Sequence, residues 1–302
     1  MSFELVSIVG PTASGKSNLA IELALSLGDS EVINTDAMQL YRGMDIGTAK
    51  LTASEMRGVP HHLISVIDPT AEISVVEYRQ LFDDAFADIV QRGKTPISVG
   101  GSTLYLAAAL DELSFAPTDL ELRSKLEAEG ERIGALGMWE RLREADPEAA
   151  EKIPASNRRR VIRAIEVITI TGKNYASALP EPRYRRRTLQ FGILVPRELL
   201  VQRIEARVRA MWRQGLVDEV ARLQSDFPAL SRTARVAIGY KQAAAQLAGE
   251  MTEEDAIAET VQLTTRYAKK QMTWLRRDER IIWLDSSSNL LEQALEQIRL
   301  EQ

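Results

Sequence analysis

The chain has 302 residues, 45% of them hydrophobic and 27% charged, a composition typical of soluble globular proteins. The absence of cysteine excludes disulfides and thiolate metal sites, and the only two histidines, His61 and His62, are too few for a histidine-rich zinc site. The longest uninterrupted apolar run, 104–110, is too short to span a membrane, and no basic leader precedes the first apolar stretch. We therefore expect a cytoplasmic protein without a membrane segment.

Charge is divided unevenly along the chain, although the net charge is only −5. Residues 1–150 carry 12 lysines and arginines against 24 acidic residues, whereas residues 151–302 carry 26 against 19. The net charges of the two halves are therefore −12 and +7, which favours a polyanionic partner for the second half. Arginine-rich helices that only solvate their own surfaces would give the same count, so the positions of the basic residues must decide.

Short apolar runs alternate with helical patterns in the first third of the chain. We predict strands over 4–9, 31–34 and 95–99, and helices over 16–27, 75–91 and from Ser102 to Leu110. Strands that alternate with helices indicate a parallel sheet. The predicted fold class is therefore α/β, with a P-loop NTPase-like parallel sheet core.

The pattern changes from about Glu112 to Arg187, where no strand is predicted. The segments 119–131, 139–145 and 157–171 have helical patterns, and Gly172 would end the last of them. A strand over 190–195, helices over 197–224 and 252–277 and a final strand over 281–284 complete the predicted regular structure. We therefore predict a core of residues 1–111 and 189–302, interrupted by a mostly helical insertion of residues 112–188.

The segment from Gly10 to Ser17, Gly-Pro-Thr-Ala-Ser-Gly-Lys-Ser, matches the P-loop pattern and lies between a predicted strand and a predicted helix. Glycines allow the backbone to curl so that several N–H groups converge on phosphate oxygens, and the helix N-terminus adds partial positive charge. Lys16 supplies a mobile cation, and Ser17 is placed to bind Mg²⁺. The segment therefore predicts a phosphate site, without specifying the reaction.

The strand-end carboxylate of this chain follows a different strand from the usual one. P-loop proteins that hydrolyse nucleotides usually carry a metal-binding carboxylate at the end of a later apolar strand. Here the strand over 95–99 ends in Gly100 and Gly101, and the strand-end carboxylate is Asp36. We infer that this acid serves an acceptor molecule, with a helix cap or a surface turn as its alternative role.

Three further groups of polar residues accompany these motifs. Ser102 is either a helix N-cap or, because strand C-termini line the ligand crevice of a parallel sheet, a neighbour of Asp36. Arg159, Arg160 and Arg163 share one side of a predicted helix, and a basic side is also predicted for the late helix, which contains Arg266 and Lys270. Two basic helical faces suit a nucleic-acid backbone. Tyr267 and Trp274 could stack on bases, although core packing is their commoner role.

Along nearly its whole length, the chain resembles the tRNA dimethylallyltransferase (tRNA isopentenyltransferase) family. The resemblance rests on the P-loop and on long segments that occur in the family's order: 36–41, 43–50, 60–63, 99–105, 160–166, 238–241 and 266–274. It implies transfer of a dimethylallyl group from its diphosphate to the exocyclic amine of the adenosine next to the anticodon. It also implies Mg²⁺ as cofactor and the tRNA anticodon stem-loop as partner. We expect the chain to act as a monomer.

The resemblance also assigns roles to individual residues. The diphosphate would be bound by the P-loop and an arginine beyond it: Gly10, Thr12, Ala13, Ser14, Gly15, Lys16, Ser17 and Arg207. Catalysis would involve Asp36 as the base, Ser102 and Lys16, and Ser17 would assist the metal. The tRNA would be contacted by Asp36, Ala37, Met38, Gln39, Ser102, Arg123, Arg159, Arg160, Arg163, Arg266 and Lys270.

Two positions depart from the family pattern, which usually has threonine at Ser102 and serine at Ala37. Serine keeps the hydroxyl, with looser control of its rotamer, whereas Ala37 can contact RNA only through its backbone. Three other functions remain open from the residues alone: a small-molecule or nucleotide kinase, a prenyltransferase for free adenine nucleotides, and a non-enzymatic RNA-binding protein.

Overall fold

The computed structural model describes residues 3–113, 118–175 and 183–301. The chain forms two compact units. The core unit comprises Met1–Glu112 and Arg183–Gln302, and the insertion unit comprises Leu113–Pro182. None of the described helices is both long and apolar enough to cross a membrane.

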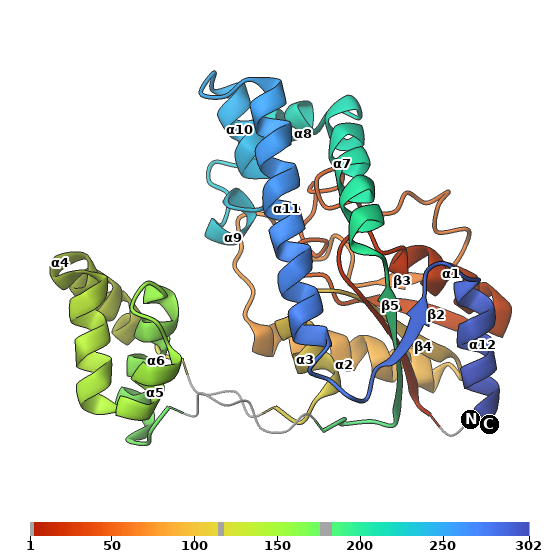
Figure 1. The fold of residues 1–302 in the computed structure, drawn as a ribbon, viewed down its shortest axis with the longest axis horizontal. Coiled ribbons are helices and arrows are strands. Elements are labelled where there is room, and N and C mark those ends of the chain that lie inside the picture. Colours follow the sequence, from red (N-terminus) through yellow and green to blue (C-terminus); the bar gives the residue numbers. More distant parts are fainter. Residues whose placement is uncertain (1–2, 114–117, 176–182, 302) are drawn as a thin grey trace. The chain divides into compact units, whose positions relative to one another are not determined.

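The core unit is built on one six-stranded sheet in which all neighbouring strands run parallel (Figure 1). The strands are β1 (Leu5–Val9), β2 (Ser30–Asn34), β3 (His61–His62), β4 (Thr95–Gly100), β5 (Thr188–Leu194) and β6 (Ile282–Asp285). Their order across the sheet is β3-β2-β4-β1-β5-β6. The predicted α/β class is confirmed. Because β1 lies inside the sheet, the loop that follows it opens at the middle of the edge formed by the strand C-termini.

Helices cover both faces of this sheet, as the continuous apolar runs of its strands require. They are α1 (Lys16–Leu27), α2 (Val75–Gln91), α3 (Thr103–Leu110), α7 (Arg197–Arg213), α8 (Leu216–Asp226), α9 (Arg232–Arg235), α10 (Tyr240–Leu247), α11 (Glu253–Leu275) and α12 (Leu290–Leu300). Helices α1 and α12 pack against each other and share a buried core with the sheet, while α2 packs against β2 and β4 from the other face (Figure 1).

A second hydrophobic core lies beyond the strand C-termini, between α7, α8, α10 and α11. It includes Trp212 and Tyr240 from the helices, and Tyr41 and Met44 from the segment that follows β2. The predicted apolar stripe of α11 contributes to this core through Ile257 and other residues. This core therefore fixes the segment after β2 above the sheet edge where the P-loop opens.

The insertion unit is helical and has its own core. Its helices are α4 (Leu120–Ala145), α5 (Pro147–Lys152) and α6 (Arg158–Thr171). Buried side chains from all three form one cluster, which includes Leu126, Met138, Ala149 and Val161. Gly172 adopts a left-handed conformation (φ 64°) and ends α6, as predicted.

The predicted insertion, 112–188, extends further at its C-terminal end than this unit. Residues 183–187 belong to the core unit, because they make hydrogen bonds with residues of that unit that precede the insertion. The Glu112 N–H donates to the Arg183 carbonyl at 2.8 Å, and the Arg185 guanidinium binds Asp83 through two hydrogen bonds of 2.9 and 2.8 Å. Part of the predicted insertion, 114–117 and 176–182, lies outside the described residues.

The two helices expected over 119–131 and 139–145 are present, because a non-helical conformation at Gly134 (φ 76°) divides α4 into two helical parts. Two predictions about individual elements were wrong. The helix expected over 197–224 is two, α7 and α8, because Gly215 adopts φ 95° between them. Regular structure does not end at 281–284, since α12 follows β6, and no prediction was made for the short elements β3, α5, α9 and α10.

Candidate active site

The P-loop joins β1 to α1 at the centre of the sheet edge, as expected. Two of its residues have positive φ, Ala13 at 63° and Gly15 at 95°, and Gly15 is the N-cap of α1 without a side-chain cap. The loop therefore curls tightly, and the N–H groups in the first turn of α1 have no intrahelical partner. Gly10 also requires its lack of a side chain, because a Cβ there would lie 2.7 Å from the Ser14 Oγ.

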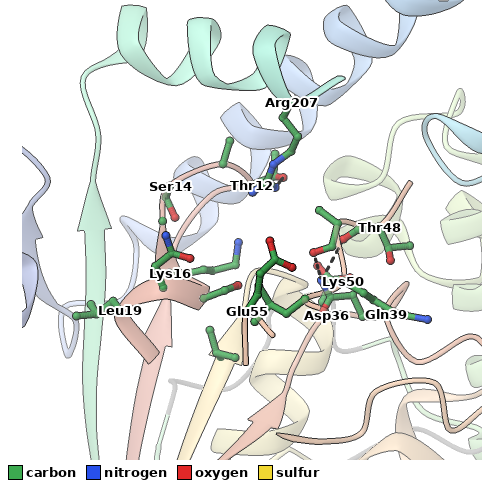
Figure 2. Close-up of a pocket in the computed structure, with 18 of the residues that line it drawn as sticks. Thr12, Ser14, Lys16, Leu19, Asp36, Gln39, Thr48, Lys50, Glu55 and Arg207 are labelled. Atoms are coloured by element: carbon green, nitrogen blue, oxygen red, sulfur yellow. Dashed lines mark hydrogen bonds between the residues drawn. The ribbon is translucent and has the colours of Figure 1, made fainter. Parts of the chain in front are cut away.

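Two basic side chains face the cavity beside this loop (Figure 2). The Lys16 ammonium donates to the Pro11 carbonyl at 3.2 Å, and the Arg207 guanidinium donates to the Thr12 hydroxyl at 3.4 Å. Burial lowers the pKa of Lys16 to about 8; the Asp36 carboxylate opposes this fall and Arg207 adds to it. Burial also lowers the pKa of Arg207, again opposed by Asp36. Both cations are therefore incompletely compensated and attract an anion.

Hydroxyl groups of the P-loop complete the cradle. Ser14 is buried, and its Oγ has no hydrogen-bond partner among the described residues. A buried hydroxyl without a partner is costly unless a ligand supplies one. Ser17, one position after the lysine, also lines the cavity. Among the described residues, no three His, Cys, Asp or Glu side chains group closely enough to hold a metal ion by themselves.

Asp36 lies at the end of β2 and lines the same cavity. Its Oδ1 accepts the Met38 N–H at 2.9 Å, and its own N–H donates to Asn34 Oδ1 at 2.9 Å. One carboxylate oxygen therefore shapes the turn, which is the structural role considered above. The Asp36 carboxylate still acts electrostatically on both Lys16 and Arg207, so it faces the phosphate-binding side as well.

Ser102 is the N-cap residue of α3, but its side chain makes no cap hydrogen bond. Its Oγ accepts instead the Ala37 N–H at 3.0 Å, which ties the loop after β4 to the loop after β2. The structure thus brings Ser102, Asp36 and the P-loop together at one edge of the sheet. Tyr267 of α11 lies near Asp36. Burial and the Asp36 charge raise the pKa of its hydroxyl, although 38% of the residue is exposed. It is not fully packed in the core.

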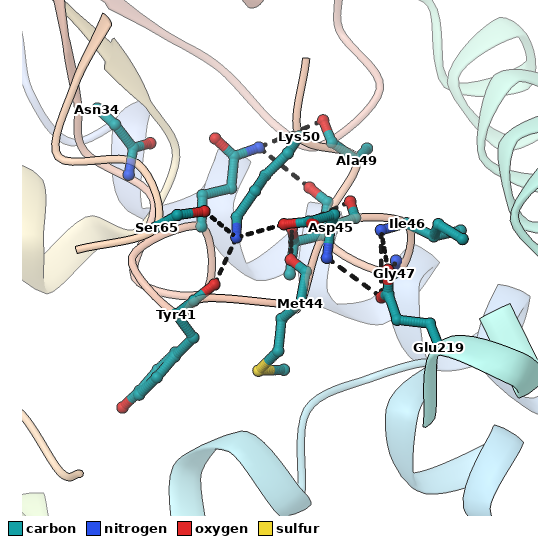
Figure 3. A network of polar contacts seen from close by, with 12 residues as sticks. Asn34, Tyr41, Met44, Asp45, Ile46, Gly47, Ala49, Lys50, Ser65 and Glu219 are labelled. Atoms are coloured by element: carbon teal, nitrogen blue, oxygen red, sulfur yellow. Dashed lines mark hydrogen bonds and ion pairs between the residues drawn. The ribbon is translucent and has the colours of Figure 1, made fainter. Parts of the chain in front are cut away.

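The Gln39 side chain is engaged within the protein. Its amide donates to the Thr48 and Ala49 carbonyls at 3.0 and 3.4 Å. The side chain of Lys50, which follows Ala49, is almost fully buried. It donates to the Tyr41 carbonyl and, at 2.8 Å each, to Asp45 Oδ1 and the Ser65 hydroxyl (Figure 3). These contacts fix the segment 44–50, which forms one wall of the cavity.

The same wall is held from behind by a buried carboxylate on α8. Glu219 accepts the N–H groups of Asp45, Ile46 and Gly47, with the shortest contact 2.9 Å, and it accepts the Tyr240 hydroxyl at 2.6 Å. The sequence analysis missed both Lys50 and Glu219. Lys50 ends one of the segments on which the family resemblance rests, but the resemblance assigned it no role. Glu219 left no signal, because the N–H groups it accepts lie far away in the sequence.

The cavity has a volume of about 950 Å³ and lies entirely within the core unit. It is lined by the P-loop, by Asp36 and Gln39, by the segment 45–52 and by α7, which contributes Arg203 and Arg207. Such a volume accommodates a ligand of the size of a small cofactor. The cavity offers cations at one side and a carboxylate at another, so it can hold a phosphate group and a proton-releasing acceptor together.

The expected RNA contacts of the insertion unit have mixed environments. Arg123 and Arg163 both bind Glu166, a fully buried carboxylate, at 2.7 and 2.9 Å, and the Asp119 N–H donates to the same carboxylate. Arg159 and Arg160 are exposed at the start of α6. In the core unit, Arg266 and Lys270 are exposed on α11.

The fold and the site are those of a P-loop-like α/β enzyme that handles a phosphate-bearing substrate. A family model described as IPP transferase matches residues 39–278. The chain belongs to this family, and the expected resemblance to tRNA dimethylallyltransferases is confirmed.

Relatives and solved structures agree with this assignment. A tRNA dimethylallyltransferase of Salinispora tropica is 48% identical over 98% of this chain and 92% of that protein, and one of Streptomyces griseus is 51% identical over 93% and 89%. The tRNA isopentenylpyrophosphate transferase of Bacillus halodurans is 38% identical with a TM-score of 0.70, covering 98% of this chain and 95% of that one. A eukaryotic dimethylallyltransferase acting on tRNA has a TM-score of 0.81 at 26% identity, covering 98% and 78%.

Proposed function

We propose that the chain transfers a dimethylallyl group from dimethylallyl diphosphate to the exocyclic amine of the adenosine 3′-adjacent to the anticodon in tRNA. The bond between the allylic carbon and the diphosphate oxygen breaks, a carbon–nitrogen bond forms, and diphosphate leaves. The amine loses one proton. The observation that carries the proposal is that the Asp36 carboxylate shares one cavity with the P-loop, Lys16 and Arg207.

The phosphate side of the cavity stabilises the leaving group. Negative charge grows on the diphosphate as its bond to carbon breaks, and preorganised donors stabilise such charge without reorganisation. The donors are the N–H groups at the start of α1, the Ser14 hydroxyl, and the Lys16 and Arg207 side chains. Because the cations are largely buried, their attraction for the diphosphate is less screened by water.

The hydroxyl of Ser17 and the carboxylate of Asp36, which both line the cavity, are hard oxygen donors. The Ser14 hydroxyl has no hydrogen-bond partner among the described residues and can therefore bind a ligand. These groups fit Mg²⁺, which keeps several waters and binds through few protein oxygens together with substrate phosphates. When bound, Mg²⁺ would neutralise charge on the diphosphate. Ser17 would be its protein ligand.

The acceptor side of the cavity collects the proton. The amine of adenine is a weak nucleophile, because its lone pair is delocalised into the ring. Asp36 accepts a hydrogen bond and then the proton from the attacking amine. General-base catalysis of this kind contributes about 10²–10⁴-fold to the rate. Ser102 holds the Ala37 N–H and so keeps the Asp36 turn in place. The base reaches this cavity only after leaving its stack.

The tRNA is bound by basic residues of both units: Arg123, Arg159, Arg160 and Arg163 in the insertion unit, and Arg266 and Lys270 in the core unit. Two observations support this assignment. Residues 151–302 carry a net charge of +7, and four of these residues are exposed: Arg159, Arg160, Arg266 and Lys270. Ala37, Met38 and Gln39 line the approach of the base through their backbone, since the Gln39 amide is already engaged. We propose that one chain, as a cytoplasmic monomer, suffices.

Incubation of the purified protein with dimethylallyl diphosphate, Mg²⁺ and bulk tRNA tests the proposal. Mass analysis of the nucleosides should show a prenylated adenosine, and ATP should not be required. Asp36→Asn should retain tRNA affinity within a few-fold and lose about 10²-fold or more in rate, whereas Asp84→Asn, which changes an exposed carboxylate of α2, should be silent. Strict ATP dependence, or ATP turnover without RNA, would indicate a kinase instead.

Ser102 offers a second, matched pair of variants. Ser102→Thr keeps the hydroxyl that accepts the Ala37 N–H and should leave the rate nearly unchanged. Ser102→Ala removes the acceptor and should slow turnover. Equal rates for both variants would show that the hydroxyl is dispensable for the reaction.

A further inference from the structure

Gln271 connects two loops of the candidate site through a single side-chain amide. It lies in α11 and is 2% exposed. Its Oε1 accepts the Thr12 N–H of the P-loop at 3.0 Å, and its Nε2 donates to the Gly101 carbonyl in the loop after β4 at 2.7 Å. These two loops belong to neighbouring parallel strands, β1 and β4, but Gln271 comes from a distant part of the chain.

The loop after β4 packs closely against the P-loop at Gly101. A Cβ at Gly101 would lie 2.5 Å from the Gln271 Nε2 and 2.7 Å from the Gly10 carbonyl oxygen, both far below a normal contact. Gly101 therefore packs with its backbone against the P-loop and against the amide. The amide bridges the two loops, with its oxygen on the Thr12 N–H and its nitrogen on the Gly101 carbonyl.

Each loop carries one half of the proposed reaction. Thr12 belongs to the diphosphate cradle, and its hydroxyl also binds Arg207. Gly101 precedes Ser102, whose hydroxyl holds the Ala37 N–H and thereby the turn that presents Asp36. A shift of the loop after β4 relative to the P-loop would therefore move the acceptor side relative to the leaving group.

We propose that Gln271 is a positioning residue that fixes the distance between the diphosphate cradle and the acceptor side of the cavity. This inference rests on the proposed prenyl transfer and adds a residue to it. In a displacement, the incoming amine and the departing oxygen lie on opposite sides of the carbon, so their separation must be correct at the moment of reaction. A positional shift of about 1 Å between the reacting groups is enough to lower the rate roughly 10²-fold.

The amide is suited to this task because it offers one acceptor and one donor in a rigid plane. Methionine has a similar length but offers neither strong hydrogen bond. Asparagine keeps the amide but is one methylene shorter, so it cannot reach both loops at once. The apolar neighbours Ala268 and Leu275 remain buried around the position in either variant, which preserves the packing of α11.

The test compares Gln271→Met and Gln271→Asn with the wild type and with Gln262→Met, a control at an exposed glutamine of the same helix. We expect kcat for tRNA prenylation to fall by about 10–10²-fold in both Gln271 variants. The dissociation constants for dimethylallyl diphosphate and for tRNA, measured separately, should stay within about threefold, because each half-site remains intact. Gln262→Met should match the wild type in all three measurements.

Gly101→Ala perturbs the same spacing from the opposite side. Its Cβ would push against the amide and the P-loop carbonyl, so the same selective loss of kcat is expected. An unchanged kcat in the Gln271 variants would overturn the inference, and so would weaker donor binding at unchanged kcat. Unfolding of Gln271→Asn at the assay temperature would also overturn it, since the amide would then serve folding. A wild type that fails to prenylate tRNA would refute the proposed function instead.

Discussion

The lowered pKa of Lys16 predicts that the affinity for dimethylallyl diphosphate depends on pH between 7 and 9. In the free protein this pKa is about 8, because burial disfavours the ammonium. A bound diphosphate favours the charged form, so binding near pH 8 should take up a proton. The affinity should then fall as the pH rises, because the lysine must be protonated at increasing cost.

The expected magnitude follows from this pKa. A group with a pKa of about 8 is roughly 90% protonated at pH 7 and roughly 10% protonated at pH 9. If the ammonium form carries the tight binding, the association constant should fall about tenfold over this range, and binding at pH 8 should take up about half a proton. The ligand contributes little to this change, since phosphate monoesters complete their ionisation near pH 6.

Isothermal titration calorimetry without tRNA measures both quantities, at three pH values and in two buffers that differ in ionisation enthalpy. Lys16→Met should bind more weakly and show an affinity independent of pH. Lys94→Met removes a different lysine, whose ammonium binds Glu31 at 2.7 Å, and should keep the wild-type pH dependence. A wild-type affinity constant within twofold from pH 7 to 9, without proton uptake, would refute the reasoning.

Three further predictions concern charged residues away from the phosphate cradle. Glu31→Gln removes a carboxylate shared by three basic side chains and should lower the free energy of unfolding by about 2–4 kcal/mol in urea at pH 7. These contacts hold the pKa of Glu31 well below its usual value, so the wild type should keep their contribution to stability above pH 4.5 and lose it only in strong acid. Arg159→Ala should reduce the slope of log affinity for tRNA against log salt by about one unit, and Arg163→Ala by less, because Glu166 already offsets part of its charge; equal reductions would contradict this. Glu219→Gln should lower the free energy of unfolding by about 1–3 kcal/mol in urea, since an amide accepts fewer backbone N–H bonds, and an unchanged value would show that the wall at 45–47 holds itself.

The elements that the sequence predicted well are those whose signals are local. The helices over 16–27 and 75–91 have the predicted bounds, and the second begins with a complete capping box between Ser74 and Glu77. The helix α12 also has such signals, an Asn289 cap followed by apolar residues at helical spacing, but it was overlooked. Very short elements such as β3 contain too few residues for any periodicity to be read.

The candidate site was predictable only where a motif or a strand end marks it. The P-loop and Asp36 lie where strand C-termini meet, so the topology places them together. Lys50 could not be found in this way, because its partners occur at irregular spacings in a segment without regular structure. Glu219 could not either, because most of its partners are backbone N–H groups of that segment. A contact between a side chain and distant backbone leaves no spacing pattern in the sequence.

The structure also gives a physical reason why the acid of this site comes from β2. In P-loop proteins that hydrolyse nucleotides, a carboxylate commonly ends a later strand. Here that position at the end of β4 holds glycines that leave no space: a Cβ at Gly100 would lie 2.5 Å from the Thr35 carbonyl carbon, and one at Gly101 would lie 2.7 Å from the Gly10 oxygen. Since close backbone packing fills the place of a metal-binding acid, Asp36 enters the cavity from the neighbouring strand. From there it faces both the phosphate side and the space left for an acceptor, which supports group transfer rather than nucleotide hydrolysis.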